Sequence, residues 1–413
     1  MESETTKSSV IYFYPSTTTT TTTAYNIATT AATTSSSSST AATTATTSIL
    51  IAVIKSLLLG SIIICAVVGN ALVILSVSRY HNLRTKANMF IVSLAFADLL
   101  VALLVMPFSA SQEVAGRWLF DGVTCDLFNA NDVLFSTASL LNLCCISLDR
   151  YIAITDPFNY TTRLNKCRVV VILVSAWLAS ILVSHLPIHL KIYSADAFGR
   201  QQKIINDDDE EVINEICSFQ VNWLYGIVSS LISFWIPTIV MLFTYQKIFN
   251  EAKRQVEQIE NITNLLSAFQ AEMKNQAAAA LQQQTNNENR RIKREHKAAK
   301  TLGIIMGVFL GCWLPFFIWY LTDSICREQC NTPKVFISFL FWVGYANSAL
   351  NPLIYAFFNR EFRGAFRKQL CHCKRALTWS RAKKPHLVTE LAASYSERHN
   401  WSGEVSYNKK DDI

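Results

Sequence analysis

The chain has 413 residues, of which 51% are hydrophobic and only 16% are charged. Soluble domains usually carry roughly 25% charged residues, so this composition excludes an ordinary soluble protein and indicates a membrane protein. The formal net charge is +7. Because the basic residues gather beside apolar stretches, we interpret this charge as a topology signal and not as a surface for nucleic acid.

The N-terminal segment is unlike the rest of the chain. Residues 1–48 contain long runs of Thr, Ser and Ala. They lack the charged start and apolar core of a cleaved signal peptide. Their composition predicts a disordered extracellular tail.

Seven apolar stretches follow, each near the ~20 residues that a helix needs to cross a bilayer. They are Ile49–Val77, Met89–Ala110, Leu127–Ile154, Val169–Ile188, Trp223–Phe249, Ala298–Leu321 and Val335–Phe358. The predicted fold is therefore an all-α membrane protein, a bundle of seven transmembrane helices over residues 49–370.

The basic residues orient this bundle. Groups of Lys and Arg follow the first, third and seventh stretches and precede the sixth. All of them fall on one side, which we predict to be cytoplasmic, with the N terminus outside. Residues 251–294, rich in Gln, Asn and Ala, are predicted as a flexible third cytoplasmic loop. A short amphipathic eighth helix and a cytoplasmic tail, 371–413, complete the chain.

The cysteines divide according to this topology. Four lie on the predicted outer side, where oxidation is expected: Cys125, Cys217, Cys326 and Cys330. Three pairings of these four remain open. Cys371 and Cys373 follow the amphipathic stretch beside the membrane and are candidates for palmitoylation.

Asp132 is a carboxylate inside an apolar stretch. Burying its charge is costly unless it meets a partner, so a functional site is one interpretation and a structural acid paired to a neighbouring helix is the other. The two are equally supported by this residue alone. Tyr345, in the seventh stretch, is placed to donate a hydrogen bond to it.

Two further groups suggest a ligand. Trp313, Phe316 and Phe317 share one helix face, which predicts either an aromatic box around an amine or ordinary core packing. Ser229 and Ser233 also share a face, with Ser230 beside them. Such hydroxyls could bond a ring hydroxyl of a ligand, but serine is equally common between packed membrane helices.

Five motifs occur in chain order, one per expected span: Gly69-Asn70, Ser93-Leu94-Ala95-Phe96-Ala97-Asp98, Asp149-Arg150-Tyr151, Cys312-Trp313-Leu314-Pro315 and Asn351-Pro352-Leu353-Ile354-Tyr355. In this order they resemble the rhodopsin class of G-protein-coupled receptors over nearly all of Ile51 to Leu370. Within that class the chain resembles biogenic-amine receptors. The stretches Phe135-Ser136-Thr137-Ala138-Ser139, Ser233-Phe234-Trp235-Ile236-Pro237 and 294–303 look most like invertebrate beta-type octopamine receptors, with cyclase-stimulating dopamine receptors and histamine receptors close behind.

The resemblance implies a receptor for a small aromatic amine, octopamine first and dopamine second, acting through a stimulatory G protein to raise cyclic AMP. It places ligand contacts at Asp132, Val133, Ser136, Ser229, Ser230, Ser233, Trp313, Phe316, Phe317 and Tyr345. It also favours disulfides joining Cys125 to Cys217 and Cys326 to Cys330. Tyramine, histamine and serotonin remain alternative ligands. An opsin would need a lysine where this chain has Tyr345, and neither a transporter nor an enzyme has comparable support.

On the cytoplasmic side, the resemblance implies that Arg150 pairs with Asp149 and Glu295 until activation releases it to the G protein. The other residues of this switch are Tyr151, Tyr245, Asn351, Pro352 and Tyr355. Asp98, Ser139, Asn347 and Asn351 match the class's buried sodium site, and no other cofactor is expected. Arrestin, receptor kinases and membrane lipids are the further expected partners.

One stretch departs from the pattern. After Leu186-Pro187-Ile188, the relatives usually continue through a Gly-Trp pair, whereas this chain reads His189-Leu190-Lys191-Ile192. The loop that follows carries an acidic run from Asp207 to Glu211, which is interpreted either as a solvated face or as an attractor for cations. The conformation of this loop cannot be predicted by analogy.

Overall fold

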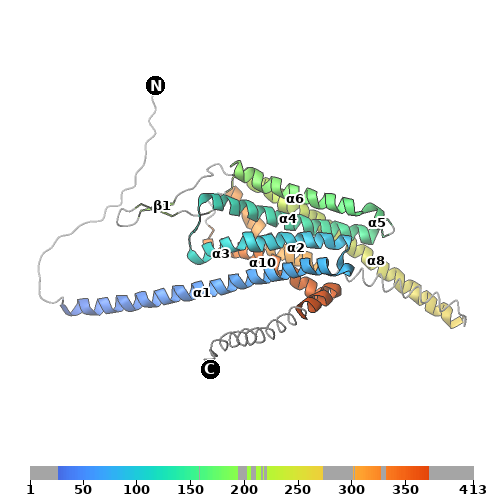
Figure 1. Cartoon of the computed structure of the whole chain (residues 1–413), viewed down its shortest axis with the longest axis horizontal. Helices are drawn as coiled ribbons and strands as arrows, with labels where there is room; N and C mark the ends of the chain where they lie inside the picture. Colours follow the sequence, from blue (N-terminus) through green and yellow to red (C-terminus); the bar gives the residue numbers. More distant parts are fainter. Residues whose placement is uncertain are drawn as a thin grey trace, which may run out of the picture. The chain divides into compact units, whose positions relative to one another are not determined.

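The computed structural model describes residues 27–157, 159–193, 202–205, 211–214, 217, 221–272, 301, 303–326 and 332–371. The chain divides into one unit up to Lys55 and a second from Ser56 onward. Within the described residues the chain is almost entirely helical, as the sequence predicts (Figure 1).

The long helices match the predicted spans in order. They are α1 (Ile27–Arg79), α2 (Lys86–Leu104) with α3 (Met106–Ala115), α4 (Gly122–Thr155), α6 (Lys166–His189), α7 (Trp223–Ser230) with α8 (Ile236–Glu272), the helix Gly303–Cys326, and α10 (Lys334–Phe358). All but α10 are apolar and long enough to cross a membrane. The seventh, α10, has 25 residues but carries the buried polar side chains Asn347 and Asn351.

Short elements connect these helices. A 3₁₀ turn, η1 (His81–Leu83), follows α1, and α5 (Tyr160–Arg163) follows α4. The second span divides into α2 and α3 beside Pro107, whose missing N–H interrupts the helical ladder. A final helix occupies 360–371 and buries Phe362, Ala365 and Phe366, which is the spacing of an amphipathic helix.

Two helices run beyond their predicted limits. The first begins at Ile27, inside the segment predicted as a disordered tail, where each added residue extends an existing helix by one hydrogen bond without a new nucleus. The fifth continues to Glu272, inside the loop predicted to be flexible from residue 251. Pairs at helical spacing, Arg254 with Glu251 and Lys253 with Glu257, stabilise this polar extension, a local effect that bulk composition does not reveal.

Strands β1 (Gln202–Ile205) and β2 (Glu211–Asn214) form an antiparallel hairpin in the loop after α6. The sequence analysis did not predict it. Apolar and polar residues do not alternate regularly in these two short strands, so their hydrophobic periodicity gave no signal.

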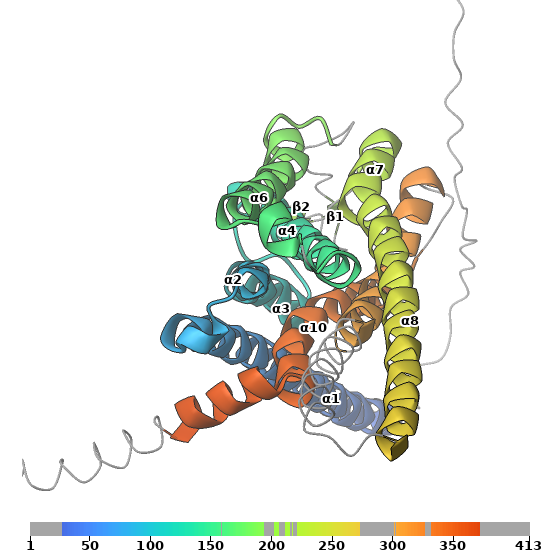
Figure 2. The same cartoon turned by 90° about the vertical axis from the view of Figure 1, so that its right-hand side faces the viewer.

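The bundle packs around α4. This helix contacts α2, α6 and α8, and Figure 2 shows it between them when the helices are seen nearly end on. Polar side chains that are buried between packed helices need hydrogen-bond partners there. Asn70 of α1, fully buried, donates from Nδ2 to the carbonyl oxygen of Ser348 at 2.9 Å and so joins α1 to α10.

The fifth span contains an irregular turn. Between α7 and α8, residues Leu231–Trp235 (η2) form a π-helical turn, in which the N–H of Ile236 bonds to the carbonyl of Leu231, five residues earlier. Pro237 follows and has no N–H to offer to the carbonyl of Ser233. The extra residue in this turn sets which faces Ser229 and Ser233 present to the bundle.

Candidate functional site

The Asp132 carboxylate lies half-buried on α4. The hydroxyl of Tyr345 on α10 donates to its Oδ2 at 2.8 Å, which confirms the predicted contact. Ser136, one turn further along α4, donates to Oδ1 over a longer 3.4 Å. Among the ion pairs found between described residues, none involves Asp132. The structure therefore leaves a partly buried aspartate whose carboxylate has two neutral hydroxyl partners.

The serines of the fifth span reach across the bundle. Ser233 accepts a hydrogen bond from Thr137 of α4 at 2.9 Å, and Ser229 lies 3.1 Å from the hydroxyl of Tyr320. Ser230 instead donates to the carbonyl of Ile227 in its own helix at 3.0 Å. All three are buried. Ser229 and Ser233 thus face other helices, whereas Ser230 satisfies its hydroxyl locally.

Trp313, Phe316 and Phe317 form a continuous group of rings, as predicted. Trp313 and Phe316 meet edge to face, with ring centroids 5.7 Å apart, and so do Phe316 and Phe317 at 5.2 Å. All three are buried. Phe317 also stacks on Phe234 of η2 with centroids 4.3 Å apart. These rings therefore lie between the fifth span and α10.

Several neighbours in this region were not predicted. Phe341 contacts Phe316 at 4.8 Å between centroids and Tyr345 at 6.1 Å, so it joins the rings to the partner of Asp132. Tyr320 stacks on Phe316 at 5.8 Å. Helical spacing could have found both, because Phe341 precedes Tyr345 by four residues and Tyr320 follows Phe316 by four. Thr137 had no such signal, since its contact joins two helices.

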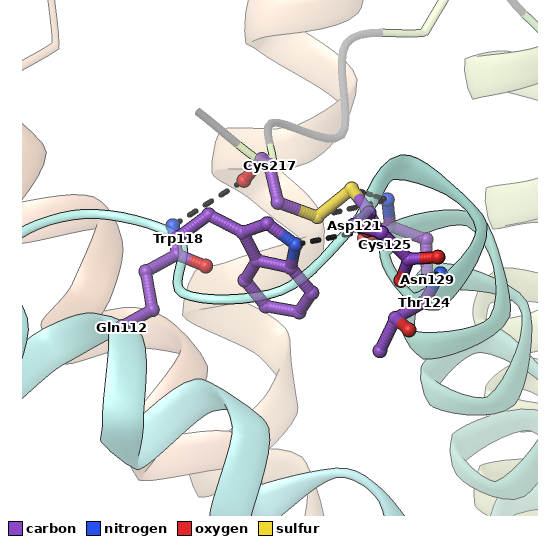
Figure 3. Close-up of a disulfide and its surroundings, with 7 residues drawn as sticks. All are labelled: Gln112, Trp118, Asp121, Thr124, Cys125, Asn129 and Cys217. Carbon is purple, nitrogen blue, oxygen red and sulfur yellow. Dashed lines mark hydrogen bonds between the residues drawn. A yellow bond between two sulfur atoms is a disulfide. The ribbon is translucent and has the colours of Figure 1, made fainter. Parts of the chain in front are cut away.

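The Cys125–Cys217 disulfide joins the start of α4 to the loop after α6, which confirms the predicted pairing. Figure 3 shows Gln112 of α3 donating to the carbonyl of Cys217 at 3.3 Å. Asp121 caps α4 by accepting from the N–H of Thr124 at 3.1 Å. The hydrogen bonds from Thr124 lower the pKa of Asp121, so it stays ionised as a cap. The Cys125–Cys217 disulfide holds the loop after α6 against the start of α4, two helical turns from Asp132.

The structure describes only some of the other predicted cysteines and ligand contacts. Cys326 is disulfide-bonded, but Cys330 lies outside the described residues, so their pairing stays a prediction. Cys371 is an exposed free thiol, and Cys373 lies outside the described residues. Val133 packs against a cluster that contains Ala130 and Tyr225.

Asp98 is completely buried and has three hydrogen-bond donors around it. Asn351 donates from Nδ2 at 2.8 Å, Ser348 at 2.9 Å and Ser139 at 3.1 Å. Ser348 was not predicted, although it lies three residues before Asn351 on the same helix face. The buried Oδ1 atoms of Asn347 and Asn351 accept no hydrogen bond within the described part of the chain.

This oxygen-rich set fits a small hard cation. The carboxylate of Asp98, two hydroxyls and the amide oxygen of Asn351, which has no donor in the described part of the chain, are the ligand types that such ions prefer. No group of three or more His, Cys, Asp or Glu occurs among the residues that the structure describes. The donor set therefore matches sodium better than a transition metal.

At the other end of α4, Arg150 forms an ion pair with Asp149. Tyr160 of α5 donates its hydroxyl to the same carboxylate at 2.8 Å, a partner that the sequence analysis missed. Burial and then the charge of Asp149 raise the pKa of Tyr160 to about 12, so the donor keeps its hydrogen at neutral pH. Glu295, the second predicted partner of Arg150, lies outside the described residues.

The remaining predicted switch residues each pack against another helix or are buried in their own. Tyr151 is half-buried on α4, and Tyr245 packs so closely on Gly303 that a Cβ there would overlap its hydroxyl. Tyr355 is buried, its hydroxyl has no partner among the described residues, and its ring stacks on Phe362 at 5.5 Å. Pro352 lies within α10 against Gly69 of α1.

Comparison with known proteins decides the family. Residues 69–355 match the model described as 7 transmembrane receptor (rhodopsin family). The chain belongs to the rhodopsin family of seven-transmembrane receptors. It is thus a multi-pass plasma-membrane receptor and not an enzyme, and α10 is its seventh span.

Curated relatives of the receptor are similar over most of its length. It is 45% identical over 327 residues to Octopamine receptor beta-2R of Chilo suppressalis, covering 76% of this chain and 80% of that protein. It is 46% identical to Octopamine receptor beta-1R of Drosophila melanogaster, covering 76% of this chain and 60% of the relative. The D(1) dopamine receptor of Carassius auratus is 40% identical, with coverages of 75% and 85%.

Proposed function

We propose that the receptor binds a small aromatic amine, octopamine first and dopamine second, and activates a stimulatory G protein that raises cyclic AMP. The observation that carries this proposal is the half-buried Asp132 carboxylate, which has two hydroxyl partners and no cation in the described residues. A protonated amine about 4 Å away would gain roughly 4 kcal/mol at an effective dielectric near 20, before desolvation.

The positions of the serines support a ligand that spans from α4 to the fifth helix. Thr137 lies five residues beyond Asp132, or about 7.5 Å along α4, and bonds Ser233. Ser229 lies four residues before Ser233, or about 6 Å back along the fifth span, which runs through the bundle in the same direction as the third span. Ser229 and Asp132 are therefore at similar depth. An amine bound at Asp132 would direct its ring hydroxyls toward Ser229 and Ser233.

The choice of ligand follows the relatives. Those that are named octopamine receptors are 45% and 46% identical, and the dopamine receptor is 40% identical. Both ligands carry ring hydroxyls that suit Ser229 and Ser233. Tyramine, histamine and serotonin are the comparison ligands in the assay below.

Activation would act through the opposite end of α4. Ligand contacts that differ between conformers shift their equilibrium. We expect the ring of Trp313 to form the floor of the amine site and to transmit this shift. The helix Gly303–Cys326 would then move, which frees Arg150 from Asp149 for the G protein. Sodium at Asp98 would favour the resting state. We further expect an extracellular N terminus, a palmitoylated Cys371 in contact with lipid, and desensitisation by receptor kinases and arrestin.

The deciding experiment is a cyclic AMP assay in cells that express Asp132→Asn. Octopamine, dopamine, tyramine, histamine and serotonin are each applied, and surface expression is measured in parallel. We expect the response to be abolished at unchanged surface expression. Asp126→Asn, on the same helix near its start, is the matched control and should keep its response. Retained potency in Asp132→Asn, or a fall in cyclic AMP on wild-type receptor, would refute the proposal.

A further inference from the structure

The last turn of α6 carries two histidines on one face. His185 is half-buried and His189 is exposed, and they stand four residues apart with Pro187 between them. Neither takes part in the amine site or the cytoplasmic switch. His189 also begins the stretch where this chain departs from its relatives' usual pattern.

The nitrogens of the two rings are nearly as far apart as two ligands of one metal ion. Nδ1 of His185 lies 3.0 Å from Nε2 of His189, and the ring centroids are 5.1 Å apart. Zinc binds imidazole nitrogen at roughly 2.0–2.1 Å in tetrahedral sites, which places two nitrogen ligands about 3.3 Å from each other. The separation of the two nitrogens would therefore have to grow by only a few tenths of an ångström, with each ring turning so that its nitrogen lone pair points at the metal ion.

We propose that His185 and His189 form a binding site for a divalent transition metal ion, with Zn²⁺ as its probe, at the C-terminal turn of α6. Paired histidines at this spacing on one helix face are established zinc ligands. The hydrogen that the two nitrogens share would move to the other nitrogen of its ring, so both imidazoles stay neutral and no proton is lost. Mg²⁺ and Ca²⁺ prefer oxygen ligands and should not compete.

This turn is tied to the start of the fifth span. Pro187 has no N–H for the carbonyl of Val183, and the hydroxyl of Tyr225 on α7 donates to that carbonyl instead, at 3.1 Å. Asn222, which caps α7, also donates from Nδ2 to the carbonyl of Ile192 at 2.8 Å.

A metal that bridges the two histidines would fix the turn to which Tyr225 is attached. Tyr225 stands one helical turn before Ser229, so a metal ion that fixes this turn would also influence the position of Ser229 in the amine site. The binding of zinc itself does not depend on which amine the receptor recognises.

The test uses the full-length receptor purified in detergent with a tag that contains no histidine. Its unfolding temperature is measured against increasing Zn²⁺, and bound zinc is counted after gel filtration. We expect a saturable rise with one zinc per receptor, absent in His185→Ala and in His189→Ala. His81→Ala, in the turn after α1, is the matched control and should keep the rise. Mg²⁺ should produce none.

Two outcomes would overturn the site. One is the absence of any saturable zinc effect on the wild-type receptor, and the other is an equal effect in both histidine variants, which would place the metal elsewhere. Because His189 is exposed, its replacement should leave the metal-free unfolding temperature nearly unchanged. Loss of the zinc effect in that variant can then be attributed to the missing imidazole.

The regulatory consequence has its own measurement. Zinc should shift the half-maximal concentration of the activating amine by about fivefold or more in wild-type receptor, the usual scale of coupling between two sites. Tyr225→Phe should lose this shift while keeping the zinc-dependent rise in unfolding temperature. An amine response that zinc leaves unchanged would refute the coupling to the amine site.

Discussion

Gly344→Ala tests how tightly Trp313 is held against α10. A Cβ at Gly344 would lie 2.9 Å from Cζ3 of Trp313 and 3.0 Å from Cη2. The indole cannot retreat easily, because Phe316 and Phe317 pack on it with centroids 5.7 Å and 6.1 Å away. Overpacking of this kind costs roughly 1–3 kcal/mol.

A matched variant separates this cost from helix propensity. Alanine in a helix interior is favoured over glycine by about 1 kcal/mol. Gly311→Ala, two residues before Trp313, should gain this helix propensity without any overpacking, because a Cβ there meets nothing within 4 Å. Gly344→Ala should therefore be about 1–3 kcal/mol less stable than Gly311→Ala, or roughly 2–12 °C lower in unfolding temperature.

The assay is thermal unfolding of both purified variants in the same detergent, with wild-type receptor beside them. Gly311→Ala should unfold at or slightly above the wild-type temperature. If Gly344→Ala unfolds at the same temperature as Gly311→Ala or higher, the contact between Trp313 and α10 is not tight, and the proposed role of this ring as the floor of the amine site loses its structural basis.

Three further predictions concern other parts of the bundle. Cys125→Ser with Cys217→Ser removes a bond that spans 92 residues and should cost about 4–5 kcal/mol on the chain-entropy model, lowering surface expression measured by antibody staining. Asp98→Asn should abolish the effect of replacing K⁺ with Na⁺ on agonist binding to membranes, because the substitution removes the only charge of the cluster. Tyr160→Phe removes a hydrogen bond to Asp149 and should raise basal cyclic AMP, since that carboxylate then holds Arg150 less firmly.

Each of these has a contrary result. Normal surface expression of the double serine variant would show that the outer loop is held without its disulfide. Sodium sensitivity that survives Asp98→Asn would move the ion to another site. Unchanged basal cyclic AMP in Tyr160→Phe, at equal surface expression, would mean that Tyr160 does not support the ion pair.

The sequence by itself determined the seven spans and the positions of the main site residues. Hydropathy over about 20 residues is a local property, so the order of the helices could be predicted without any tertiary contact. Asp132 was identifiable for the same reason, since a carboxylate in an apolar span is conspicuous. Its bond to Tyr345 was also predicted, from the place of both residues in apolar spans.

Element limits were predicted less well where composition and local pairing disagree. The first turns of the extension of α8 to Glu272 contain ion pairs one turn apart inside a polar segment. The π-helical turn at Leu231–Trp235 had no signal beyond the nearby Pro237. Average composition does not contain the spacing of charges, so it predicted a loop where the chain is helical.

Only the tertiary structure decided which hydroxyl meets which partner. Thr137 with Ser233, Ser348 with Asp98 and Tyr225 with Val183 each join helices that are far apart in the chain. These contacts depend on how each helix is rotated and how it crosses its neighbour, which ridge-into-groove packing sets and no single segment encodes. The spacing of His185 and His189 on one helix was readable from the sequence, but the hydrogen bond that ties their turn to Tyr225 of the fifth span was not.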